Sequence, residues 1–212
     1  MANKREKERR EKENLLNQYK ESRDKLLPFY LASAIICAVS IFGYFFNWVY
    51  IYNSNPAVGV EKSVSGFSAV INALTLKKYT SANIAIYGDM NVFYYFAKNY
   101  CVPLATIALV ALILTVISTV LGFVIFFTKR QELSLISELF TIASAVMTII
   151  CFGIALSMNG SRILPEFCSG NPLCSMRSLA IIPALVLVAA SVVQGIAAVK
   201  YFILKRNNPD FD

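Results

Sequence analysis

Cysteines are the side chains with the clearest covalent chemistry in this chain, because it contains five of them and no histidine. Cys168 and Cys174 bracket the turn-forming sequence Ser-Gly-Asn-Pro-Leu. In an oxidising compartment such a close pair is suited to a local disulfide, which either rigidifies a contact loop or only staples a connection. Cys101 would then be a free thiol or a competing partner. Cys37 and Cys151 lie within long apolar runs and should behave as small apolar side chains.

Acid–base and metal chemistry have little basis in this sequence. The lack of histidine removes the commonest general base and metal ligand, and the cysteines show no metal-ligand spacing. Glu138 is the one acid inside a long apolar run, and we place it in the first turns of a helix, where the helix dipole favours a carboxylate. Lys200, near the end of the last run, can snorkel to the interface. We therefore predict no enzymatic activity, no metal and no cofactor.

Four long apolar runs must position these residues. A helix needs roughly 20 apolar residues to cross about 30 Å of hydrocarbon, and each run is long enough. The composition agrees, with 57% hydrophobic residues, 16% charged residues and a mean hydropathy of +0.56, whereas soluble domains have about 25% charged residues. We predict an all-α membrane protein, a four-transmembrane-helix bundle forming one domain over 28–204. The predicted spans are 28–52, 101–127, 133–158 and 178–204.

The distribution of positive charge predicts the sidedness of the bundle. Fourteen of the 20 lysines and arginines lie in segment 1–27, in the 128–132 connection or from Lys200 onwards. Because such residues are retained in the cytoplasm, we expect cytoplasmic N- and C-termini, including the 205–212 tail, and outer loops 53–100 and 159–177. This sidedness also accounts for the net charge of +7, so nucleic acid is not an expected partner. The composition favours a bacterial plasma membrane, although an organelle membrane satisfies the same physics.

The N-terminal segment 1–27 is expected to form a charged helix that runs into the first span. It is interpreted as an anchor that fixes orientation, with two alternatives: a docking helix for a cytoplasmic partner, or a helix lying on anionic lipid. Pairs of opposite charge four residues apart support the helix: Glu6 with Arg10, Glu8 with Lys12, and Glu21 with Lys25.

Two outer segments are candidates for partner contact. Residues 66–76 carry apolar side chains at intervals of three and four, which predicts a short extracellular amphipathic helix. This helix could lie on the membrane, cap the bundle or face another protein. Aromatic residues before the second span predict interfacial anchoring or a recognition surface. The candidate contact residues are Phe67, Val70, Ile71 and Leu74 in the helix, and Phe93, Tyr94 and Tyr95 in the aromatic cluster.

Small residues four apart occur in every predicted span, and this spacing lets helix backbones approach closely. Serine, threonine, Asn47 and Gln194 within the runs can hydrogen-bond between helices, or they could line a pore. We interpret both sets as packing features of a compact bundle. The small-residue pairs are Ala34 and Ala38, Ser118 and Gly122, Gly153 and Ser157, and Ser191 and Gly195.

Four spans with cytoplasmic ends and a longer first outer loop resemble the layout of claudin and MARVEL-type proteins. The first loop has no cysteine pair and no Trp-Gly-Leu-Trp-type motif, and the second lacks the Cys-Cys-Gly of tetraspanins. Topology alone transfers no activity. We therefore expect a non-enzymatic membrane scaffold or accessory subunit that contacts the lipid bilayer and other membrane proteins, or a second copy of itself. The alternative is a channel or transporter subunit with a path lined by serine and threonine.

Overall fold

The computed structural model describes residues 2–53, 60–74, 102–157 and 174–208. These ranges are mostly helical, and they contain four helices long and apolar enough to cross a membrane. The prediction of four helices with the length and composition to span a membrane is thereby confirmed, and they fit a membrane-embedded protein. The helices are α2 (Leu27–Phe42), α6 (Val102–Thr128), α7 (Ser134–Ser157) and α9 (Ile181–Asn207).

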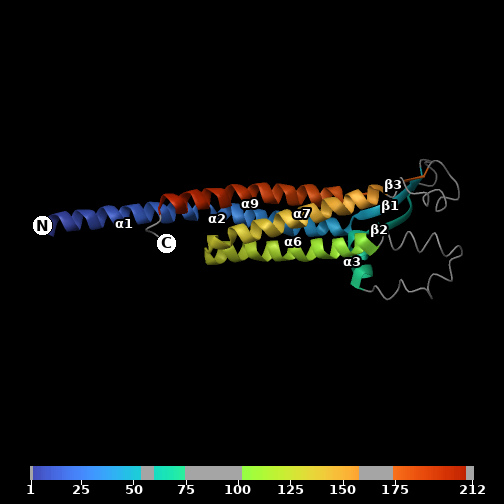
Figure 1. Cartoon of the computed structure of the whole chain (residues 1–212), viewed down its shortest axis with the longest axis horizontal. Coiled ribbons are helices and arrows are strands. Elements are labelled where there is room, and N and C mark those ends of the chain that lie inside the picture. Colours follow the sequence, from blue (N-terminus) through green and yellow to red (C-terminus); the bar gives the residue numbers. More distant parts are fainter. Residues whose placement is uncertain (1, 54–59, 75–101, 158–173, 209–212) are drawn as a thin grey trace.

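The four long helices form a closed ring around a common axis. Helix α2 packs against α6 and α9, and α7 packs against the same two helices. Figure 1 shows an elongated bundle with α1 (Ala2–Asp24) projecting from one end. The strands lie at the opposite end. We call these the α1 end and the sheet end.

The chain after α2 differs from the prediction, because the first helical span does not reach Tyr52 and the protein is not all-α. A 3-10 turn follows α2, and the next residues form the central strand of an antiparallel sheet in the order β2-β1-β3. The sequence Trp-Val-Tyr-Ile-Tyr at 48–52 is rich in the aromatic and β-branched residues that favour strands. The elements are η1 (Gly43–Phe45), β1 (Asn47–Asn53), β2 (Val60–Ser65) and β3 (Cys174–Arg177).

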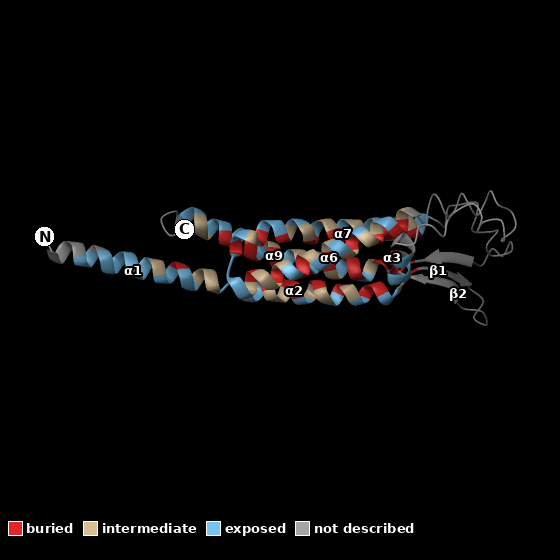
Figure 2. Cartoon of the chain, turned by 90° about the horizontal axis from the view of Figure 1, so that it is seen from below, coloured by how far each residue is buried: buried red, intermediate tan, exposed pale blue. Residues whose placement is uncertain are grey.

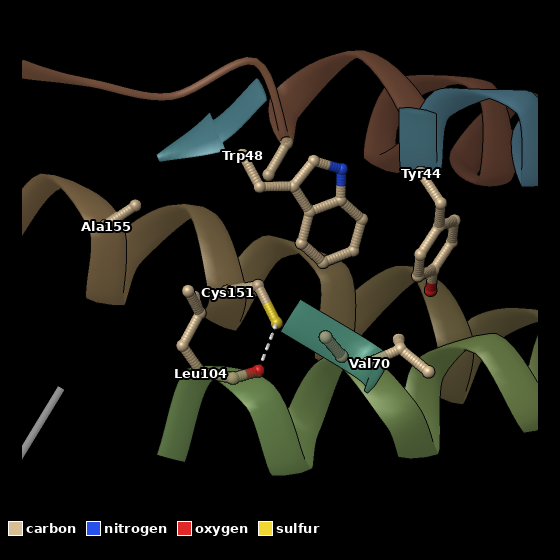
Figure 3. Packing of buried hydrophobic residues seen from close by; sticks show 8 residues of the cluster. Tyr44, Trp48, Val70, Leu104, Cys151 and Ala155 are labelled. Atoms are coloured by element: carbon tan, nitrogen blue, oxygen red, sulfur yellow. Dashed lines mark hydrogen bonds between the residues drawn. The ribbon is translucent and has the colours of Figure 1, made fainter. Parts of the chain in front are cut away.

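The amphipathic segment is helical as α3 (Gly66–Leu74). Its Val70 is buried in a cluster with Tyr44, Trp48 and Leu104, whereas Phe67 on the same helix is largely exposed. Figure 3 shows Val70 and the Trp48 indole lying between the ends of the long helices. Helix α3 therefore covers the sheet end of the bundle with one face.

The charged N-terminal segment forms α1, which is mostly exposed along its length (Figure 2). Ion pairs join Glu6 to Arg10 at 2.9 Å and Glu21 to Lys25 at 2.8 Å, as predicted. The predicted partner of Lys12 lies among the residues whose side chains are not described. A turn after Asp24 separates α1 from α2. The charged helix therefore precedes the first span as a separate helix.

Candidate functional site

The interior of the bundle is polar along much of its length. On α7, Ser134, Ser137, Thr141, Ser144 and Thr148 are all fully buried. Their spacing of three and four residues places them on one helix face. Because burying a hydroxyl without a partner is costly, such a stripe must either bond to neighbouring helices or contact water. In the described part of the chain, the other buried polar residues are Ser33, Ser40, Thr115, Ser118, Thr119, Gln131, Ser178 and Gln194.

Gln194 joins three of the four helices. Its side-chain oxygen Oε1 accepts hydrogen bonds from Ser33 Oγ of α2 at 2.9 Å and from Thr141 Oγ1 of α7 at 3.5 Å. Its amide nitrogen donates to the carbonyl oxygen of Ser134 at 3.4 Å. The amide of Gln194 therefore serves as a cross-link between α2, α7 and α9.

A second set of contacts brings α6 into the same network. Ser118 of α6 and Thr141 share a short hydrogen bond, and Ser118 also contacts the Cys37 thiol of α2 at 3.8 Å. Closer to the sheet end, the Ser144 hydroxyl donates to the carbonyl oxygen of Ala111 at 3.0 Å and lies beside the Thr115 hydroxyl. In the middle of the bundle the hydroxyls thus bond to one another and to helix backbone, which is the packing interpretation of these residues.

Glu138 occupies a different environment near the α1 end. Its Oε1 atom accepts a hydrogen bond from Ser191 Oγ of α9 at 2.6 Å. A Cβ at Gly195 would lie 3.5 Å from the same carboxylate oxygen, so the small pair of α9 provides space for this side chain. Two buried oxygens here, Glu138 Oε2 and Ser137 Oγ, have no hydrogen-bond partner within the described ranges, and Tyr30 Oη and Ser134 Oγ have none there apart from each other.

The other predicted pairs of small residues differ in whether they lie against a neighbouring helix. A Cβ at Gly122 would lie only 2.8 Å from the Ala34 Cβ, so α2 and α6 are in close backbone contact at this point. In contrast, the structure does not bring Gly153 or Ser157 against another helix. A Cβ at Gly153 would meet no atom within 4 Å, and the Ser157 hydroxyl donates to its own helix at Ile154. Among the described residues this last pair therefore makes no contact between helices.

Several predicted contacts lie outside the described residues. Cys168 and the aromatic residues Phe93, Tyr94 and Tyr95 are in segments without a described structure, and the side chains of Cys174 and Leu74 are not described. Within the described segments, no group of three or more histidine, cysteine or acidic residues could hold a metal ion. The oxygens available along the axis are hydroxyls, amides and the carboxylate of Glu138.

A polar clasp at the α1 end was not predicted. The Gln131 amide of η4 (Gln131–Leu133) donates to the carbonyl oxygen of Arg23 at 2.7 Å, and Lys129 Nζ lies 3.0 Å from Asp24 Oδ2. Lys129 adopts a φ of 58°, the left-handed conformation that commonly ends a helix. The clasp ties the end of α1 to the α6–α7 connection, and its partners are too far apart in sequence to be paired by inspection.

Replacing Gln194 by leucine tests whether the central network stabilises the bundle. We expect the substitution to cost about 1–2 kcal/mol, the range for interhelical hydrogen bonds in membranes, and to lower the Tm by roughly 2–8 °C. Ser33 retains its second bond, to the carbonyl oxygen of Ala190 at 3.1 Å, so the loss should stay moderate. Thermal unfolding in detergent measures the shift. Gln18→Leu on the exposed α1 face is the control, and equal Tm values for both variants would contradict a stabilising network.

These features define a four-helix membrane bundle with a polar axis, closed at one end by a small sheet and a short helix. No family model, curated protein or solved structure matches the chain.

Proposed function

We propose that this protein is a non-enzymatic membrane scaffold or accessory subunit of a membrane protein complex. The hydrogen bonding of the buried polar groups supports this proposal. The hydroxyls of Ser118, Thr141 and Ser144 and the amide of Gln194 bond to each other and to the helices around them, so they hold the bundle together. The parts that extend beyond this core, α1 and the sheet end, are then available for contacts with other proteins.

We propose that the protein lies in a bacterial plasma membrane and that its α1 end faces the cytoplasm. Lys129 and Arg130 directly follow the second span at the α1 end, and Lys205 and Arg206 lie in the last turn of α9. Retention of basic residues in the cytoplasm favours this arrangement over its inverse. Helix α3 and the sheet would then lie at the outer surface.

Exposed aromatic side chains mark the proposed contact surface at the sheet end. Phe45 and Phe67 stack with ring centroids 5.6 Å apart, and both are largely exposed, at 64% and 44%. Aromatic side chains are favoured anchors in protein interfaces. We propose that this pair contacts another membrane protein or a second copy of this chain, while the surrounding apolar side chains contact lipid.

Purification from native membranes in a mild detergent tests this function. We expect a stoichiometric partner or a defined oligomer, and a loss of that association when Phe45 and Phe67 are both replaced by serine. Val120→Ser, on an exposed face of α6, serves as a matched control for the loss of an exposed apolar side chain. A monomer with no associated protein would overturn the proposal.

A channel or transporter subunit is the second candidate, supported by the continuity of buried polar residues from Gln131 to Thr148 along the axis. Reconstitution into liposomes, followed by flux measurements with several ions and small solutes, separates the two candidates. Flux that is reduced by Thr141→Val would favour a conducting path. Impermeability to every solute would leave the scaffold function.

A further inference from the structure

We infer that Glu138, Tyr30 and Ser134 form a binding site for a single positive charge, supplied as a proton or as an alkali-metal ion. This inference is independent of the proposed scaffold function, because Tyr30 and Ser134 are fully buried and Glu138 is half-buried between helices, away from the proposed contact surface at the sheet end. Glu138 belongs to the second turn of α7, and a charged group at this depth is costly unless it is compensated.

Only one of the two carboxylate oxygens of Glu138 has a hydrogen-bond partner among the described residues. Ser191 Oγ donates to Oε1 at 2.6 Å, whereas Oε2 is buried and has no partner in the described part of the chain. Glu138 takes part in none of the ion pairs found among the described residues. The amine of Lys200, on the neighbouring helix α9, lies over the Phe29 ring at 5.9 Å. Among the described residues, the negative charge therefore lacks a cationic partner.

Two buried hydroxyls lie near this carboxylate. Ser134 lies one turn before Glu138 on α7, so both project from the same side of the helix. The Tyr30 hydroxyl of α2 lies beside Ser134 and within electrostatic range of Glu138. Both hydroxyl oxygens are fully buried, and apart from each other they have no hydrogen-bond partner within the described ranges. These oxygens and Oε2 are of the type that binds hard cations.

The surrounding groups determine the charge that the site would take. The titratable side chains within electrostatic range of Glu138 are Tyr30 and Cys37 of α2, with Tyr201 of α9 in range of Tyr30, and such groups are ordinarily neutral near pH 7. Helix α6 contains no titratable residue. One carboxylate without a counter-charge matches one positive charge. A divalent ion would leave the low-dielectric interior with an excess positive charge.

Ion-dependent thermal unfolding in detergent tests the site. Trp48 is the single tryptophan, and its fluorescence reports unfolding from the opposite end of the bundle. One arm exchanges choline chloride for sodium or potassium chloride at constant ionic strength and pH, and the other lowers the pH in choline chloride alone. Near 100 times the Kd we expect the Tm to rise by about 5–10 °C. A rise in the first arm identifies an alkali-metal ion, and a rise only in the second identifies a proton.

Glu138→Gln should abolish the response, whereas Glu132→Gln, at an exposed acid outside the bundle, should retain it. Should Glu138→Gln fail to fold, Tyr30→Phe and Ser134→Ala each remove one oxygen and keep the acid. We expect each to weaken binding by about tenfold, equivalent to one lost hydrogen bond or ligand. The inference is overturned by a wild-type Tm that rises in neither arm. An unchanged response in Glu138→Gln, or in both oxygen-deleted variants, would overturn it equally.

Discussion

Replacing Gly66 by leucine is expected to destabilise the protein by about 3 kcal/mol, the upper end of the usual cost of overpacking, and to lower its Tm by roughly 6–12 °C. A Cβ at Gly66 would lie 2.5 Å from Cε2 and 2.6 Å from Nε1 of Trp48, well inside contact distance. The indole has no room to move, because Trp48 is fully buried and its Nε1 donates to the Gly43 carbonyl oxygen at 3.0 Å. The Tyr44 ring also packs on it, with centroids 4.5 Å apart. The larger side chain must therefore displace either α3 or the indole.

Trp48 reports this displacement directly. We expect its emission to shift to longer wavelength in the Gly66→Leu variant, because the expelled indole meets water or lipid headgroups. Gly153→Leu provides the control, since a Cβ at that position meets no atom within 4 Å. A Gly66→Leu protein with wild-type emission and wild-type Tm would show that α3 does not cap the bundle as the structure describes.

Replacing Gly122 by leucine is the second substitution for which we expect a large effect, about 2–4 kcal/mol from overpacking a close helix contact. A Cβ at Gly122 would lie 2.8 Å from the Ala34 Cβ and 3.3 Å from the Tyr30 carbonyl oxygen. Both atoms belong to α2, whose backbone cannot move away without disturbing its contacts with α9. We expect α2 and α6 to separate at this position.

A compensating pair makes this second test specific. Gly122→Ala alone should lower the Tm, and the addition of Ala34→Gly should restore part of the loss, because it removes the closest of the clashing atoms. Thermal unfolding of the single and double variants in the same detergent measures the coupling. Strictly additive effects would mean that the two positions are not in contact.

The four long helices could be predicted because uninterrupted apolar runs of this length have few alternatives. Strand β1 could not, because its aromatic and β-branched residues continue the apolar run of α2 with Asn47 as the one polar residue at the junction, and such runs do not distinguish helix from strand. The boundary depends on distant contacts instead. Gly43, just after α2, lies so close to Pro183 that a Cβ would approach the proline ring at 2.6 Å, and β1 pairs with β3.

The polar axis was predictable in part. The serine and threonine residues of α7 follow helical periodicity and could be assigned to one face before the structure was known. Their partners could not, because the side chains bonded to Gln194 come from α2 and α7. Small-residue spacing has the same weakness. Ser191 and Gly195 face Glu138, whereas Gly153 and Ser157 have identical spacing on an exposed face, since spacing alone carries no direction.

Closing the ring between α2 and α9 imposes an order on biosynthesis. Strand β1 follows α2, its partner β3 precedes α9, and the Leu179 amide donates to the Asn47 carbonyl oxygen at 3.0 Å. Ser33 of α2 donates to the Ala190 carbonyl oxygen, 157 positions later, which is about 8–30 s of translation at 5–20 residues per second. The first span therefore remains in the nascent chain with its polar flank uncovered until the last helix emerges.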